Sequence, residues 1–142
     1  MKLVPDTDPI LNQICIPVSS EEFGPDLVDF CKGMISVMIS NRGIGLAAPQ
    51  VGDNRRITIV SYNGSPMVVI NPIIKTKSPR RAMLREGCLS FPGVSRINTS
   101  RSKTVQVSFL DIEGNPQTKT FNGIEAVCVQ HEIDHLNGIT IK

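Results

Sequence analysis

The two histidines of this chain lie four positions apart, in the run His131-Glu132-Ile133-Asp134-His135. Residues four apart on a helix share one face and stand about 6 Å apart along its axis, so both imidazole rings can reach one metal ion. Glu132, next to the first histidine, can then exchange a proton with water beside the metal. Two neighbouring surface histidines would produce the same pattern, but we favour half of a metal site.

A catalytic metal site typically takes three protein ligands and keeps one position for water. Cys128 precedes the histidines on the same stretch. However, positions 128 and 135 are separated by about 10.5 Å of helical rise, whereas each metal bond measures only about 2 Å. We therefore expect Cys128 to line a pocket one turn away. Cys88 is the better third ligand, because the preceding Gly87 lets the backbone bend close to another element.

The composition is that of an ordinary water-soluble protein. The chain has 142 residues, of which 40% are hydrophobic and 20% charged, so we expect one domain over residues 1–142. No apolar run approaches the roughly 18 residues that cross a bilayer, and the N-terminus lacks the apolar segment of a secretory signal. We therefore predict a cytoplasmic protein without membrane contact. Its 4 cysteines show no Cys-x-x-Cys spacing and are expected to be thiols.

The net charge is only +2, but the basic residues are concentrated in one stretch. Residues 75–103 contain a single acid, Glu86, and the following basic residues: Lys75, Lys77, Arg80, Arg81, Arg85, Arg96, Arg101 and Lys103. Such a stretch can face RNA or another polyanion, although a solvated loop or sheet edge is the more common explanation. Few aromatic residues accompany it, which argues against a base-stacking platform and gives no reason to expect DNA binding.

Apolar spacing predicts one helix near the N-terminus and one near the C-terminus. Residues 1–25 contain several prolines and read as an irregular arm, after which apolar residues recur at helical spacing over 27–38, with Gly43 as a stop. The histidines belong to a second helical pattern that starts near Gly123 and ends at Gly138.

Between the two helices the pattern is typical of short strands. We expect a small-residue loop over 43–50, strands over 56–61 and 67–74, and a hairpin that pairs 104–110 with 117–121. Strands that cluster before a final helix favour an α+β fold of mostly antiparallel sheets packed around the metal-binding helix.

Three segments together resemble the signature motifs of the peptide deformylase family. These are GIGLAAPQ (43–50), EGCLS (86–90) and QHEIDHLNG (130–138), and they match in order and in approximate separation. A His-Glu-x-x-His match alone is weak, but the joint match is strong. The resemblance implies a metal-dependent hydrolase that removes the formyl group from the N-formylmethionine of new polypeptides and releases formate.

The resemblance also implies a role for each matching position. The metal ligands would be Cys88, His131 and His135. Glu132 would act first as general base and then as general acid. Gln50, through its side-chain amide, and Leu89, through its backbone N–H, would stabilise the developing oxyanion.

Further residues are candidates for contact with the peptide substrate, and each has a competing interpretation. The expected substrate contacts are Ile44, Gly45, Glu86, Ile124, Val127 and Cys128. The family reading has the Gly45 backbone pairing with an extended peptide, but this glycine can equally serve a turn. Taken singly, the apolar residues of the set are more typical of the core. Glu86 is either a residue that orients a ligand or a solvated acid.

The sequence leaves the roles of three other polar side chains open. Gln50, taken alone, can be an ordinary surface amide. Asp134 either orients a ligand or pairs with an arginine such as Arg101. Arg96 follows the cysteine motif at a slightly variable spacing, so a peptide contact there is only weakly indicated.

The identity of the metal is a separate question. A Cys/His/His set accepts iron or zinc, and zinc is intrinsically the tighter binder. The resemblance implies Fe²⁺ as the physiological ion, with Zn²⁺, Ni²⁺ or Co²⁺ possible in purified protein. A ferrous ion held by a thiolate near solvent is prone to oxidation.

The sequence ends at Lys142, seven residues after His135. Many bacterial members of the family continue into a C-terminal helix that is linked to ribosome docking. We expect activity without that helix, and the basic stretch 75–103 is our hypothesis for a substitute, transient ribosome contact. Such a minimal chain suggests a compact phage or organelle genome as well as a bacterial one. We expect a monomer.

Two other functions are compatible with part of the pattern. A zinc endopeptidase shares the His-Glu-x-x-His helix but does not need the Gly-rich loop and the Glu-Gly-Cys motif together. A protein that only binds ribosomes or peptide termini would not need a complete set of ligands and Glu132. Both alternatives are therefore less favoured than a deformylase.

Overall fold

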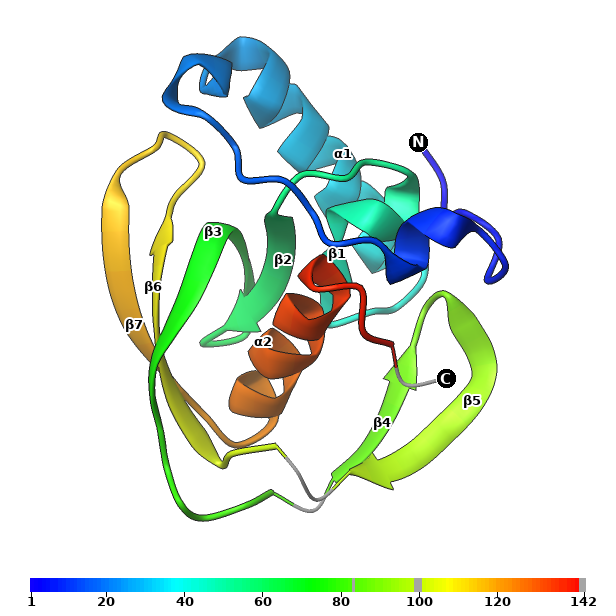
Figure 1. Cartoon of the computed structure of the whole chain (residues 1–142), viewed down its shortest axis with the longest axis vertical. Helices are drawn as coiled ribbons and strands as arrows, with labels where there is room; N and C mark the ends of the chain where they lie inside the picture. Colours follow the sequence, from blue (N-terminus) through cyan, green and yellow to red (C-terminus); the bar gives the residue numbers. More distant parts are fainter. Residues whose placement is uncertain (83, 99–100, 141–142) are drawn as a thin grey trace.

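The computed structural model describes residues 1–82, 84–98 and 101–140, without the side chains of residues 84–85 and 92–98. Two α-helices, seven strands and three short 3₁₀ turns follow one another in this part of the chain (Figure 1). In order they are η1 (Pro9–Asn12), η2 (Ser20–Glu22), α1 (Pro25–Ser40), β1 (Gly45–Ala47), η3 (Ala48–Val51), β2 (Ile57–Tyr62), β3 (Ser65–Lys77), β4 (Leu84–Cys88), β5 (Phe91–Asn98), β6 (Thr104–Leu110), β7 (Pro116–Asn122) and α2 (Gly123–Leu136).

The strands form two antiparallel sheets. One has five strands in the order β1-β2-β3-β6-β7, and the other consists of β4 and β5 alone. Helix α2 packs against β1, β2 and β7 and lies between the large sheet and the β4–β5 pair (Figure 1). The expected α+β fold around a C-terminal-region helix is therefore confirmed.

Helix α1 forms where apolar spacing predicts it. Pro25 occupies the first turn, where its missing N–H costs no hydrogen bond. The buried side chains recur at helical spacing and are Leu27, Cys31, Met34, Val37 and Met38. They join the core beside β1 and β2. The helix ends at Ser40 rather than Gly43, because residues 41–43 close it with backbone hydrogen bonds back to the last turn.

The predicted hairpin of 104–110 with 117–121 is present, and the two strands predicted over 56–61 and 67–74 also pair as a hairpin. β2 and β3 are joined through Asn63 and Gly64, which have φ values of 51° and 81°, so both adopt the left-handed conformation that a tight two-residue hairpin requires. β6 pairs with β7 in continuous register from Thr104 opposite Asn122 to Leu110 opposite Pro116. β3 and β7 are longer than expected, since they span Ser65–Lys77 and Pro116–Asn122.

The prediction of a loop over residues 43–50 was wrong for most of its length, and part of the basic stretch, expected to be a solvated loop or a sheet edge, forms two paired strands. Residues 45–47 of the expected loop form strand β1, which pairs with β2 and is fully buried, and residues 48–51 form a 3₁₀ turn. Part of the basic stretch 75–103 forms the β4–β5 pair, with a register shift at Gly87 and Cys88. In both places pairing with another segment, rather than local alternation, makes the strand.

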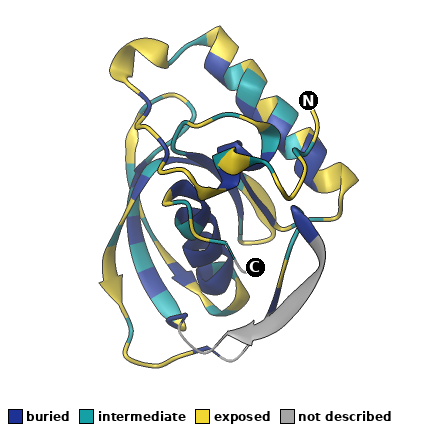
Figure 2. Cartoon of the chain, turned by 45° about the vertical axis from the view of Figure 1, so that its right-hand side comes forward, coloured by how far each residue is buried: buried dark blue, intermediate teal, exposed yellow. Residues whose placement is uncertain are grey.

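Helix α2 is buried on almost all sides, as Figure 2 shows. Four of its buried residues are polar, namely Gln130, His131, Glu132 and His135. Burying polar groups is costly unless they are hydrogen-bonded or bind an ion, so this helix marks the functional centre. Within the described residues, no helix is long and apolar enough to cross a membrane.

Candidate metal centre

Cys88, His131 and His135 converge from two elements. The cysteine ends β4 and the histidines lie one turn apart on α2, and the ligand atoms of all three lie within 4.8 Å of one another. Cys88 Sγ is 3.2 Å from His135 Nε2. The structure therefore brings Cys88 to the two histidines, and Cys128 stays outside the cluster.

The donor set suits a divalent transition metal. One thiolate and two imidazoles match the soft and borderline ligands that zinc and iron accept. His131 Nδ1 lies 2.9 Å from Glu86 Oε1, so its Nε2 is left for the ion. Such a carboxylate behind a metal-binding histidine fixes the ring and its tautomer. The cluster can bind a metal.

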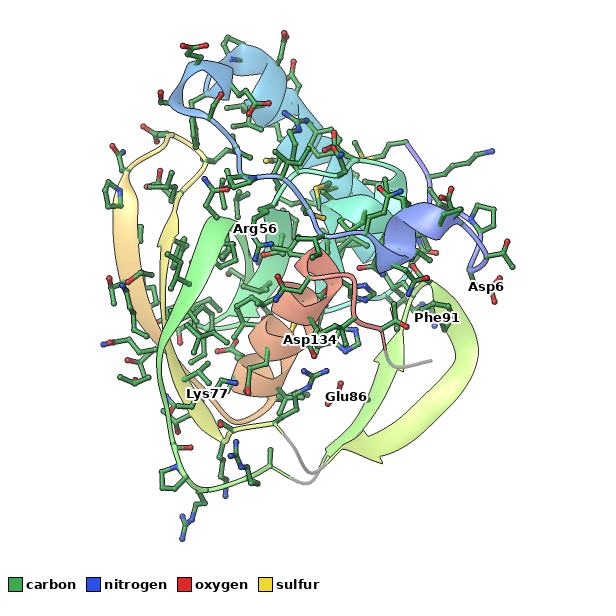
Figure 3. The ribbon with its side chains drawn as sticks, in the orientation of Figure 1. Asp6, Arg56, Lys77, Glu86, Phe91 and Asp134 are labelled. Carbon is green, nitrogen blue, oxygen red and sulfur yellow. The ribbon has the colours of Figure 1, made fainter. Side chains whose placement is uncertain are left out.

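A buried ion-pair network supports this arrangement. Arg101 donates from Nε and Nη2 to the Glu86 carboxylate at 3.0 and 3.1 Å, and from Nη1 to Asp134. Figure 3 labels Glu86 and Asp134, which lie in the space between β4 and α2. Asp134 thus pairs with Arg101, as one of the two expectations had it, and Glu86 is not a solvated acid. The side-chain amide of Gln130 holds Ser102, the neighbour of Arg101. Its Oε1 accepts from the Ser102 backbone N–H, and its Nε2 donates to the Ser102 carbonyl.

The network sets the charges of its members. Burial favours the neutral form of Glu86, but its hydrogen bonds to His131 and Arg101 outweigh burial and lower the pKa of this carboxyl. Burial opposes the charge of His131, yet hydrogen bonds to Cys88 and Glu86 raise its pKa to about 10. His131 must therefore release a proton when it binds a metal. Burial lowers the pKa of His135 to about 3, which keeps its ring neutral.

Glu132 is a buried carboxyl beside the cluster. Its side chain lines the central cavity, and Oε1 has no hydrogen-bond partner in the described structure. Burial raises its pKa to about 7, although the positive charges of His131 and Arg101 oppose this. A carboxyl that titrates near neutral pH can both accept and deliver a proton.

Gln50 is held with its amide facing the cysteine segment. Its Oε1 accepts from the Ala47 N–H at 2.9 Å, and Nε2 lies 3.1 Å from Ser90 Oγ and 3.4 Å from Cys88 Sγ. Only 1% of the residue is exposed, so the alternative of a surface amide is wrong. Ser90 was not among the expected site residues, although it is the last residue of the EGCLS segment (86–90), which was the only signal.

A cavity of about 720 Å³ opens over the cluster. All six expected substrate contacts line it, together with Leu89. Ile44 and Ile124 are 49% and 61% exposed, so the core interpretation fails for them, whereas Val127 and Cys128 are buried in the cavity wall. The sequence did not predict the lining residues Leu3, Asn41, Arg42 and Gly43.

Gly45 lies where no side chain fits. A Cβ added there would stand 2.5 Å from Glu132 Oε2 and 2.7 Å from Cys128 Sγ. The glycine belongs to β1, not to a turn. Cys128 Sγ in turn donates to the Ile44 carbonyl at 3.3 Å, which ties α2 to this segment. The predicted peptide contact at Arg96 lies outside the described side chains.

Comparison with known proteins identifies the family. The family model described as polypeptide deformylase matches residues 1–142. A peptide deformylase of Brucella suis is 39% identical over 137 residues, covering 93% of this chain and 77% of the relative. Alignments with several longer curated relatives span 55 to 61% of those proteins.

Solved structures agree with this match. A peptide deformylase from a Vibrio parahaemolyticus bacteriophage, in complex with actinonin, has a TM-score of 0.90 and 39% identity, covering 99% of this chain and 100% of that one. A Met-Ala-Ser-bound class I type b peptide deformylase from Acinetobacter baumannii has a TM-score of 0.92 and 33% identity, covering 97% and 93%. The chain belongs to the polypeptide deformylase family, the metal-dependent hydrolases that remove the N-formyl group from new polypeptides.

Proposed function

We propose that this chain hydrolyses the formyl group of N-formylmethionyl peptides, and that one domain over residues 1–142 performs the whole reaction. The observation that carries the proposal is a single cavity that brings three groups together. They are Cys88 and His131 of the Cys/His/His cluster, the carboxyl of Glu132, whose Oε1 has no hydrogen-bond partner among the described residues, and the buried amide of Gln50. Each of these has a defined task in the hydrolysis of an amide.

Cys88, His131 and His135 would hold one divalent ion. When bound, such an ion acidifies water and polarises a carbonyl oxygen. We propose Fe²⁺ as the physiological ion, with Zn²⁺, Ni²⁺ or Co²⁺ able to replace it in purified protein, since the donor set accepts all four. The neutral ring of His135 and the anchored ring of His131 support this ligand set.

Glu132 moves the proton. Its carboxylate accepts a proton from the water that attacks the formyl carbon, which becomes tetrahedral with a negative oxygen. The same carboxyl then delivers the proton to the methionine nitrogen as the C–N bond breaks, so the products are formate and a free amine. A pKa of about 7 suits both steps.

Gln50 and Leu89 would stabilise the negative oxygen. The amide Nε2 of Gln50 is fixed by its hydrogen bond to Ser90, close to Cys88, and Leu89 follows the cysteine directly along the chain. Donors that are already in place need no reorganisation when the charge develops.

The substrate would enter as an extended peptide. β1 is an edge strand of the large sheet, so its outer backbone groups can pair with a peptide at Gly45. The methionine side chain would occupy the apolar part of the cavity between Ile44, Val127 and Cys128, with Ile124 at the exposed rim.

The decisive assay is formate release from formyl-Met-Ala-amide by protein freshly loaded with Fe²⁺ or Ni²⁺. We expect turnover by the wild type and a loss of about 10²–10⁴-fold in Glu132→Ala, with unchanged metal content. A formylated and an unblocked longer peptide separate the alternatives. Cleavage of internal peptide bonds without formate would identify an endopeptidase.

We further propose a monomeric cytoplasmic enzyme that touches the ribosome transiently through the basic stretch 75–103. The exposed cations of that stretch are Lys75, Lys77, Arg80, Arg81 and Lys103, whereas Arg101 is buried in the metal-centre network and takes no part. The side chains of Arg85 and Arg96 lie outside the described part.

Ribosome pelleting at several salt concentrations tests this contact. Lys77→Glu combined with Arg80→Glu should reduce co-sedimentation at low salt. Lys32→Glu, an exposed change on α1, is the control. Equal pelleting of all three proteins would exclude this surface.

A further inference from the structure

A second groove lies next to the metal-centre cavity, along helix α1. It has a volume of about 460 Å³ and lies between residues 1–3 and the last turns of the helix. Figure 1 shows the N-terminus beside α1. Leu3 and Asn41 line both hollows, so the two are neighbours separated only by these residues.

A peptide bound as proposed above would extend from the metal-centre cavity toward this groove. The inference therefore rests on the proposed function. A Cβ at Gly45 would stand 2.5 Å from Glu132 on α2, whereas one at Gly43 would stand 3.4 Å from Met38 on α1. Residues 45 to 43 therefore run from the proton-transferring carboxyl toward α1. A peptide with its formyl group at Glu132 advances by about 3.3 Å per residue alongside this segment. Its third or fourth residue therefore arrives beside Arg42 and the shared boundary.

The outer part of this path is positively charged. Arg42 is exposed and lines the first cavity, and Lys2 is exposed and lines the second. Among the described lining residues the acids are Glu86 and Glu132, both buried at the metal centre. Neither Arg42 nor Lys2 forms an ion pair within the described part of the chain.

The backbone at Arg42 favours another residue type. Its φ of 57° is left-handed, and it occupies the position after a helix end at which the Gly43 N–H bonds back to the Met38 carbonyl at 2.9 Å. Glycine is the usual residue there, because it adopts this conformation without steric cost. The helix end therefore does not explain why an arginine stands at position 42. Its place on the rim of the cavity does.

We propose that Arg42, with Lys2 behind it, forms a subsite that selects an acidic side chain at the third or fourth residue of the formylated peptide. The charge of such a residue would be attracted by both cations and meet no exposed acid among the described lining residues. Because the subsite is open to solvent, its contribution is modest and depends on salt.

The test compares matched peptides with one enzyme preparation. The substrates are formyl-Met-Ala-Xaa-Xaa-amide with Xaa as Glu, Gln or Lys, and formyl-Met-Ala-amide as reference. We expect kcat/KM to fall in the order Glu, Gln, Lys, with about a fivefold span at low salt that shrinks at high salt. Ratios within one preparation do not depend on the fraction of active enzyme.

Three variants test whether the preference for acidic peptides arises from Arg42. Arg42→Gly should keep or raise the melting temperature, because glycine suits the left-handed position, yet lose most of the discrimination. Arg42→Glu should reverse the order of the Glu and Lys peptides. Lys32→Glu makes the same charge change on α1 without lining either hollow and should keep the wild-type order.

The outcomes separate this inference from the proposed function. Absence of formate from every peptide, formyl-Met-Ala-amide included, would contradict the deformylase function itself. Turnover with equal kcat/KM for the three charged and neutral peptides, or undiminished discrimination in Arg42→Gly, would overturn the acidic subsite alone.

Discussion

At the centre of the cavity, Glu132 is a carboxyl that folding makes harder to ionise. Burial raises its pKa from 4.5 to about 7. The contribution of its protonated form to the free energy of unfolding is therefore fully present below pH 4.5 and is lost as pH rises through 7. His135 acts in the opposite direction. Its pKa is lowered from 6.5 to about 3, so its contribution is present above pH 6.5 and is lost as pH falls.

Comparing metal-free wild type with Glu132→Gln isolates the glutamate, because His135 contributes to both proteins. As pH rises from 4.5 to 7, the free energy of unfolding of the wild type should fall relative to that of the variant by on the order of 3 kcal/mol. Urea unfolding at half-unit pH steps measures the difference. A difference that stays constant with pH would show that this carboxyl titrates normally.

Glu86 joins the proposed metal ligand His131 to the buried guanidinium of Arg101. Glu86→Gln keeps the shape of the side chain but removes its charge, so Arg101 loses its strongest partner and the ring of His131 loses its anionic acceptor. We expect metal affinity to fall about 10- to 100-fold. A competition titration with a chelating dye measures it. Asp134→Asn, which alters only the more exposed partner of Arg101, is the matched comparison and should lose less.

At the scale of elements, β1 must approach α2 closely enough that Gly45 touches Glu132. In Gly45→Ala the added methyl group would need the space of the carboxylate and of the Cys128 thiol, so either the strand or the carboxyl must shift. We expect kcat to fall by at least about 10²-fold, because a carboxyl displaced by about 1 Å no longer transfers protons efficiently. Metal content should remain at the wild-type level, as none of the ligands lies on β1. Full activity of this variant would show that Glu132 has room to move.

Elements were predictable where the signal is local. The apolar spacing of α1 and the hairpin pattern of β6 and β7 each lie within a few residues of the element they specify. β1, β4 and β5 carry no comparable pattern. The segment of β1 is three small or apolar residues, and that of β4 includes a glycine and charged side chains, so their strands form only when a partner segment supplies the hydrogen bonds.

On the scale of the whole molecule, a metal would join two separate parts of the fold. Cys88 ends β4 of the small sheet, whereas both histidines belong to α2 beneath the large sheet. An ion bound only by the folded state stabilises it by about 2.7 kcal/mol at a concentration 100 times its Kd. We therefore expect a chelator to lower the melting temperature of the loaded protein by several degrees. His135→Ala should unfold at the same temperature with and without chelator, and a large chelator effect in that variant would place the ion elsewhere.

The sequence by itself determined the helix that carries both histidines, the family and the residue types of the candidate metal centre. Two histidines four apart and a glycine-flanked cysteine define a chemistry whatever surrounds them. Only the tertiary structure decided what Glu86, Gln50 and Gly45 contact, because their partners lie three to 87 positions away along the chain. The same holds for Arg42 on the cavity rim. Spacing along a helix is a local property, whereas burial, pKa and the shape of a cavity arise only when distant segments pack together.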